Sequence, residues 1–245
     1  MRKLISLNEN WTLSFPKGER LEEKVTLPHT WNAVDGMDGN GSYLRTTGVY
    51  RCTFLKPEQP LEGGRVYVEV LAAALAAVVK VNGTVATTHE GGFSAFRADI
   101  TDLCKEGNNE MTIEVSNEDT PSMYPASADF TFYGGLYRGV NLISVPHTHF
   151  DLDYYGGSGI KVTPKPTEDG GATFEIESFV TNQEDCFTVM YSIEDACGCE
   201  VASAVRPADD TAVTIYVPDA KLWSMDEPNL YTVVARLQKN NETYD

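Results

Sequence analysis

The sequence has little helical periodicity, no long apolar run and few basic residues. No apolar stretch approaches the ~18 residues that a membrane span needs, so we expect no membrane partner. The N-terminus MRKLISLNENW lacks the apolar core of about 7–15 residues of a secretory signal, which favours a cytoplasmic protein. Lys and Arg total 19 against 36 acidic residues, a net charge of −17. Nucleic-acid binding is not expected, because it depends on clustered Lys and Arg.

Paired cysteines are also lacking. The five cysteines are scattered and odd in number, which favours reduced thiols. Cys197-Gly198-Cys199 does not have the C-x₂₋₄-C spacing usual in structural zinc sites, and four ligands are needed. We therefore interpret it as a hairpin turn that carries two thiols, and we predict no metal.

What the chain does contain is short alternating segments between turn signals. RVYVEV (65–70) and MTIEVS (111–116) alternate, and Asn82-Gly83 is a strong hairpin signal between two β-rich runs. ATFEIESFV, FTVMYSIED, AVTIYV and YTVVARLQ follow at similar spacing. The pattern predicts an all-β protein made of antiparallel sandwiches.

Two segments allow more than one interpretation at this stage. LAAALAA (71–77) consists of helix formers but is too short for a stable helix, so we expect a sheet segment or tight connection, with a single helical turn as the alternative. HTHFDLD places His147, His149, Asp151 and Asp153 at a spacing of two. On a straight strand they would share one face about 7 Å apart, too far to converge on one metal ion. We therefore expect a solvated strand face, with Phe150 and Leu152 buried.

Catalytic signatures are scarce. The chain has no Gly-x-Ser-x-Gly elbow and no phosphate-binding glycine loop before a helix. Carboxylates are plentiful, but the sequence singles out no pair with the separation that glycoside hydrolysis needs. Trp11, Trp31 and Trp223 could stack on sugar rings, although a tryptophan in a sandwich is more often part of the core.

Six motifs, in order, resemble those of glycoside hydrolase family 2: NENWTLSF, VTLPHTWNAVDGMDG, TTGVYRCTF, VVKVNGTVATTHEGGFSAFRADITDLCKEGNNEMTIEV, DFTFYGGLYRGVNLI and LWSMDEPNLYTV. The details look most like bacterial β-galactosidases. The resemblance implies a jelly-roll sugar-binding domain over residues 1–146 and an immunoglobulin-like sandwich over 147–245. The catalytic (β/α)₈ barrel, with both catalytic glutamates, is expected after residue 245, and KNNE looks like a hairpin turn whose return strand is cut short.

The resemblance also implies a role for two residues. The aspartate of the motif matching DFTFYGGLYR helps to hold the terminal sugar in this family, which assigns substrate binding to Asp129. Asn40, in the loop DGMDGNGSY, is the second candidate. We expect Gly134 and Gly135 to allow close approach of the loop to its neighbour and Arg138 to pair with a nearby acid. No catalytic residue and no cofactor is expected in this chain.

The resemblance thus implies the non-catalytic part of a retaining glycosidase. The expected partners are a β-galactoside, the chain's own barrel and further copies in a homo-oligomer; a β-glucuronidase or β-mannosidase parent is the alternative. A self-sufficient carbohydrate-binding module is a second hypothesis, and calorimetry with galactose, lactose and glucuronate would separate the two. A structural or adhesive sandwich protein is a third, which the lack of a signal sequence disfavours.

Overall fold

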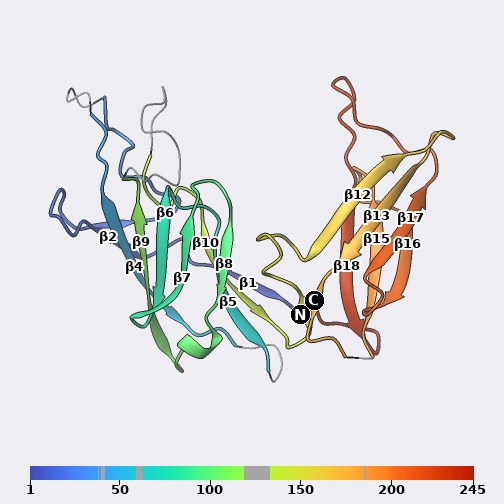
Figure 1. The fold of residues 1–245 in the computed structure, drawn as a ribbon, viewed down its shortest axis with the longest axis horizontal. Coiled ribbons are helices and arrows are strands. Elements are labelled where there is room, and N and C mark those ends of the chain that lie inside the picture. The colour runs from blue at the N-terminus through green and yellow to red at the C-terminus, as the bar shows by residue number, and fades with distance from the viewer. Residues whose placement is uncertain (38, 40–41, 59–62, 119–132, 185) are drawn as a thin grey trace. The chain divides into compact units, whose positions relative to one another are not determined.

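The computed structural model describes residues 1–37, 39, 42–58, 63–118, 133–184 and 186–245 (Figure 1). Within them it contains 19 strands and one three-residue 3₁₀ helix, Thr101–Leu103, so the predicted all-β class is confirmed. None of the described residues forms a helix that could cross a membrane. The chain divides into two compact units, chiefly Lys3–Gln59 with Arg65–Ser144, and Val145–Asp245 with Met1–Arg2. The division lies two residues before the boundary expected from the sequence.

The N-terminal unit is a sandwich of two sheets. The six-stranded sheet runs, in spatial order, β3 (Glu23–Val25), β2 (Trp11–Ser14), β4 (Thr47–Leu55), β9 (Asn108–Ser116), β6 (Ala76–Val81) and β7 (Thr84–Glu90). The four-stranded sheet runs β1 (Lys3–Ser6), β10 (Val140–Val145), β5 (Arg65–Val70) and β8 (Phe96–Asp99).

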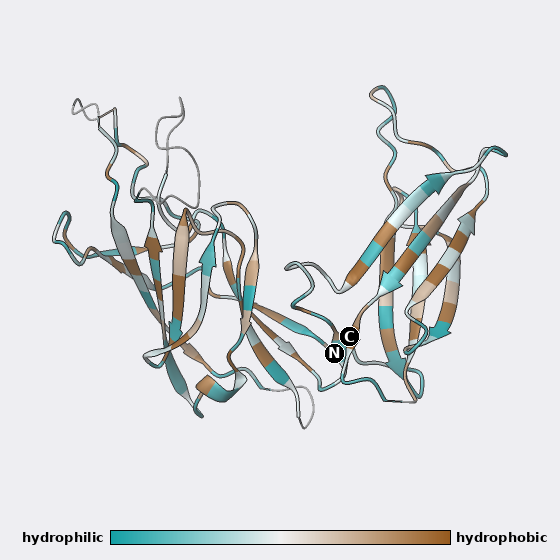
Figure 2. Ribbon diagram, in the orientation of Figure 1, coloured by the Kyte–Doolittle hydropathy of each residue, from teal (hydrophilic) through white to brown (hydrophobic). Residues whose placement is uncertain are grey.

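The core of this unit forms because apolar residues recur at every second position. On β9, Met111, Ile113 and Val115 are buried, and the residues between them are more exposed. Figure 2 shows the same alternation of apolar and polar residues along the central strands. The inward side chains pack against those of β5 and β10, including Val68 and Leu142, in one hydrophobic cluster. Removing this apolar surface from water holds the two sheets face to face.

The local predictions for this unit are confirmed. Asn82 and Gly83 join β6 to β7, both with positive φ (50° and 83°), as a tight two-residue hairpin requires. Leu71–Ala77 contains no helical turn: residues 71–75 form a tight connection after β5, and Ala76 and Ala77 are the first residues of β6. Ala72 and Ala73 within it are fully buried, which explains why the segment is built from small side chains.

The C-terminal unit is a smaller sandwich. One sheet runs β12 (Ile160–Pro166), β13 (Ala172–Ser178) and β17 (Ala212–Val217), and the other runs β16 (Glu200–Pro207), β15 (Thr188–Glu194), β18 (Thr232–Lys239) and β19 (Glu242–Thr243). Two short strands, β11 (His149–Phe150) and β14 (Val180–Thr181), form a separate antiparallel pair. Phe174 and Ile176 from one sheet pack with Val189, Tyr191 and Leu237 from the other.

Two turns of this unit match their predicted form. The segment with Cys197 and Cys199 joins β15 to β16, and both cysteines are exposed and outside any disulfide. Asn240 and Asn241, both with positive φ, join β18 to β19. The return strand β19 is two residues long, so the hairpin expected at KNNE is present with a short second arm.

The expectation for HTHFDLD is wrong in part. Phe150 and Leu152 are buried as expected, but His149 is buried too, so the four polar residues do not share a solvated face. The segment is not one straight strand, because β11 covers only His149–Phe150 and the chain bends before it. At this bend, Nδ1 of His149 lies 2.9 Å from the carbonyl oxygen of Pro146. Burial lowers the pKa of His149. The described residues contain no cluster of His, Cys, Asp and Glu suited to a metal.

Candidate functional site

A buried polar cluster centred on Asn32 joins three loops beyond the Thr47–Ser116 end of β4 and β9. The side-chain oxygen of Asn32 accepts hydrogen bonds from the Gly134 N–H (2.7 Å) and from Nδ2 of Asn117 (3.2 Å). Its Nδ2 donates to Oδ2 of Asp35 (2.6 Å) and to the carbonyl oxygen of Leu44 (2.9 Å). A carboxamide offers two donors and two acceptor positions, so all of them are used here.

Asn117 extends the cluster to the start of β4. Its Oδ1 accepts from the Thr46 N–H (2.8 Å), and its Nδ2 donates to the Leu44 carbonyl oxygen (3.1 Å) as well as to Asn32. Both asparagines are fully buried. Deleting either side chain would take a hydrogen bond away from each of its partners, and a buried polar group left unpaired costs about 1–3 kcal/mol. The cluster therefore fixes the positions of the three loops.

Asp35 is the charged member of the cluster. Its carboxylate accepts from Nη2 of Arg20 (2.6 Å), from Asn32 and from the Leu44 N–H (2.9 Å), and its side chain is 3% exposed. Burial alone would raise the pKa of Asp35, but the hydrogen bonds from Leu44, Asn32 and Arg20 hold it below its usual value. A carboxylate kept ionised by three donors is unsuited to proton transfer, so Asp35 acts as a support.

The structure explains why two glycines stand side by side before Leu136. A Cβ added to Gly134 would lie 2.0 Å from ring carbon Cζ2 of the buried Trp31. Gly135 has a φ of +128°, and a Cβ there would lie 2.6 Å from the carbonyl oxygen of His29. Thr30 Oγ1 also donates to the Gly134 carbonyl oxygen (2.8 Å). Only glycines let this loop pass so close to Trp31, which agrees with the close approach expected from the sequence.

Two exposed tyrosines mark where the loops reach the surface. Tyr43 and Tyr133 are 40% and 46% exposed, and their ring centroids lie 6.0 Å apart at nearly a right angle. Asn40 precedes Tyr43 by three residues and Asp129 precedes Tyr133 by four, and both lie outside the described residues. The structure thus brings together the ends of the two segments predicted to bind sugar, and Asn40 and Asp129 themselves stay predictions.

Other residues singled out in the sequence take different roles. Nη1 of Arg138 donates to the carbonyl oxygen of Phe93 (3.2 Å). Its partner in the structure is thus a backbone carbonyl group and not the acidic side chain that we expected. Trp11 and Trp31 are buried in the core, and neither offers a face to a sugar. Trp223, in the C-terminal unit, is 61% exposed.

The cluster itself was not predicted from the sequence. Asn32 and Asp35 lie within TWNAVDG, and a polar residue directly after a core tryptophan was the available signal. Asn117 follows the last residue of β9 and shows no sequence signal of its own.

Comparison with known proteins gives consistent matches for both units. A family model described as "Glycosyl hydrolases family 2, sugar binding domain" matches residues 4–146, and a second, "Glycosyl hydrolases family 2", matches residues 158–245. A putative β-glucuronidase of Formosa agariphila is 30% identical over 91% of this chain and 27% of its own length. A β-galactosidase of Thermoanaerobacter pseudethanolicus is 26% identical over all of this chain and 34% of its own.

Solved structures agree with these matches. The crystal structure of an FMN-binding β-glucuronidase from Facaelibacterium prausnitzii L2-6 is 84% identical, with a TM-score of 0.97, over 100% of this chain and 38% of that one. The chain therefore spans less than two fifths of the length of each of these three relatives.

The ionised state of Asp35 leads us to predict how the free energy of unfolding changes at acid pH. Because the pKa of Asp35 is lower in the folded state, its stabilising effect is present above the unfolded pKa of about 4 and is lost as the pH falls through the lower, folded pKa. We expect Asp35→Asn to lower the free energy of unfolding at pH 7 by about 1–3 kcal/mol. Its loss of stability between about pH 5 and pH 2 should be shallower than in the unsubstituted chain.

Urea unfolding followed by the fluorescence of the buried tryptophans at several pH values measures both effects. Asp102→Asn is the matched control, because its side chain is 91% exposed. Identical pH slopes for Asp35→Asn and the unsubstituted chain would contradict the assignment.

Proposed function

Because the chain belongs to glycosyl hydrolase family 2, we propose that it is the non-catalytic N-terminal part of a glycosidase that hydrolyses terminal β-glucuronides. The catalytic carboxylates of such an enzyme would lie in a (β/α)₈ barrel that follows Asp245, one as nucleophile and one as acid/base. The greater length of the relatives supports this proposal.

The choice of β-glucuronide revises the preference for β-galactoside that the motifs suggested. The main support is the 84% identity to an FMN-binding β-glucuronidase over the whole chain. A curated β-glucuronidase of Bacteroides fragilis is also 28% identical over the full chain. β-Galactoside stays the second candidate because relatives named β-galactosidase cover all or most of the chain.

The proposed role of this part is to supply one wall of the sugar pocket. The Asn32 cluster supports it, because the cluster anchors both segments that carry Asn40 and Asp129 beside a rigid sandwich. Loops held by a rigid scaffold are the usual carriers of ligand-binding residues. The burial of Trp11 and Trp31 removes two candidate sugar platforms from the alternative of a self-sufficient carbohydrate-binding module, which would have to use exposed rings such as Tyr43 and Tyr133.

Substrate choice is tested with the full-length parent enzyme. We expect kcat/KM for p-nitrophenyl β-glucuronide to exceed that for the β-galactoside by at least about 100-fold, because a site built to pair a carboxylate rejects a sugar that lacks it. The chain Met1–Asp245 alone is the control and should release no nitrophenol. A preference for the galactoside would overturn the glucuronide proposal in favour of the second candidate.

The role of Asp129 is tested by Asp129→Ala in the same enzyme. A charge-assisted hydrogen bond to a sugar hydroxyl contributes about 1.5–3 kcal/mol, so kcat/KM should fall by about 10–150-fold. Asp209→Ala, at an exposed position of the C-terminal unit, is the matched control and should leave kcat/KM unchanged. Kinetics for Asp129→Ala equal to those of the control would remove Asp129 from the site.

FMN is a further ligand proposed for the parent, on the identity to the FMN-binding relative alone. The one helix among the described residues is a three-residue 3₁₀ turn, so a phosphate held by them would depend on side chains and loop N–H groups. Heat-denatured full-length protein should release about one FMN per chain, whereas protein purified without flavin would leave the expectation of no cofactor in place.

A further inference from the structure

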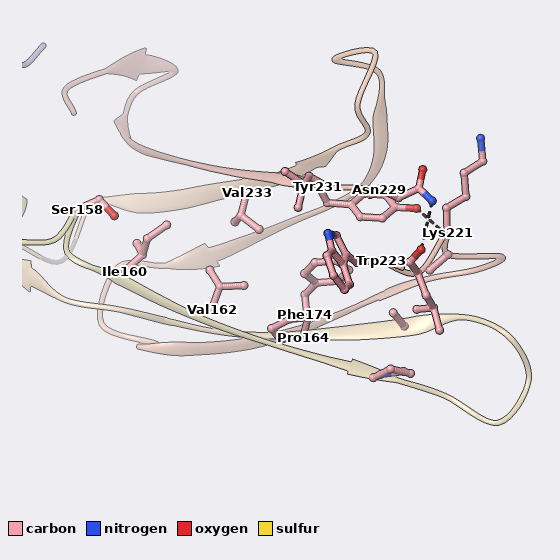
Figure 3. A pocket seen from close by; sticks show the side chains of 15 residues that line it. Ser158, Ile160, Val162, Pro164, Phe174, Lys221, Trp223, Asn229, Tyr231 and Val233 are labelled. Atoms are coloured by element: carbon pink, nitrogen blue, oxygen red, sulfur yellow. Dashed lines mark hydrogen bonds between the residues drawn. The ribbon is translucent and has the colours of Figure 1, made fainter. Parts of the chain in front are cut away.

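The C-terminal unit contains an apolar cleft of about 810 Å³ between its two sheets (Figure 3). Ile160 and Val162 of β12, with Phe174 of β13, form one wall, and Tyr231 and Val233 form the other at the start of β18. Trp223 lines the cleft although its side chain is 61% exposed. Exposed apolar surface of this extent, with an exposed tryptophan beside it, is typical of a contact site.

The cleft lies beside a part of β18 that has a paired strand on one side only. β15 pairs with β18 along its whole length, from Thr232 to Gln238, on one side. On the other side β19 pairs only with Gln238 and Lys239, and the last hydrogen bonds are those of Leu237. Backbone groups alternate along a strand, so the N–H and C=O of Val233 and Ala235 point to the same side as those of Leu237. No strand among the described residues pairs with the edge beyond Leu237.

The register of β19 indicates what belongs on this edge. The Leu237 carbonyl oxygen accepts from the N–H groups of both Tyr244 (2.8 Å) and Asp245 (3.4 Å), and the Leu237 N–H donates to the Asp245 carbonyl oxygen (2.8 Å). The pairs Gln238–Thr243 and Lys239–Glu242 are thus followed by a β-bulge, after which Asp245 lies opposite Leu237. If the antiparallel pairing continues residue by residue, the second residue after Asp245 lies opposite Ala235 and the fourth lies opposite Val233. Directly opposed residues share a face of the sheet, so both side chains would point into the cleft with Val233.

We propose that an extension of β19, formed by about five residues that follow Asp245 in the parent protein, pairs with β18 and occupies the cleft. This inference rests on the proposal that the chain continues, and it is independent of which sugar the parent cleaves. The added strand would complete the ladder along β18 and close the sandwich. It would also cover Ile160, Val162 and the exposed ring of Trp223.

A sequence pattern follows from the register. The second and fourth residues after Asp245 should be apolar, because they face the cleft, and the third should be polar, because it faces away. A gene that ends at Asp245, or that places charged residues at both inward positions, would overturn the proposal.

Hydrogen exchange tests the contact itself. Met1–Asp245 is compared with the same chain extended by the next twelve residues of the parent. The amides of Val233 and Ala235 should exchange at least about tenfold more slowly in the extended chain. The Trp223 emission should shift to shorter wavelength. The amide of Val234, which faces β15, is the internal control and should be protected in both chains.

Two substitutions in the extension distinguish pairing of the added strand in the cleft from the mere presence of extra residues. Aspartate at the second added position should abolish the protection of Val233 and Ala235, whereas aspartate at the third position, on the outer face, should preserve it. Equal exchange in the short and extended chains would contradict the proposal. So would protection in the short chain that appears only on dimerisation, since a second copy would then be the occupant. Hydrolysis of a glucuronide by the parent would be unaffected by either negative result, so the two proposals fail separately.

Discussion

The hydrogen bonds of the Asn32 side chain are the constraint on which the candidate site depends. This one carboxamide contacts Gly134, Asn117, Asp35 and Leu44, which belong to three separate loops. A fully satisfied buried amide fixes its partners because any displacement leaves a polar group without a hydrogen bond in a dry interior. The loop positions at this end of the sandwich follow from that requirement.

The rest of the site is arranged around the same point. Arg20 neutralises Asp35, and the two glycines let the third loop pass against the ring of Trp31. None of these groups is suited to bond cleavage. They form a rigid base next to the segments that carry Asn40 and Asp129, as the proposed role in a pocket wall requires.

Much of the fold could be predicted because it depends on local pattern. Alternation along the strands predicted the sandwiches, and Asn82-Gly83 predicted its hairpin, since both signals act between near neighbours. The Asn32 cluster could not be predicted in this way, because its contacts join residues 85 and 102 positions apart. His149 was misplaced for a related reason: its environment depends on a bend in the backbone that periodicity does not reveal. The substrate sugar could not be predicted, because the sequence singles out no residue that distinguishes a galactoside from a glucuronide.

The central claim is that the Asn32 cluster serves substrate binding by positioning the segment of Asp129. A double-mutant cycle on kcat/KM of the full-length enzyme, with Asn32→Ala and Asp129→Ala, tests this coupling most directly. If the claim holds, Asn32→Ala lowers kcat/KM on its own and by a clearly smaller factor once Asp129 is already alanine, when only the Asn40 segment is left for it to position. Strictly additive losses, or full activity of Asn32→Ala, would contradict it.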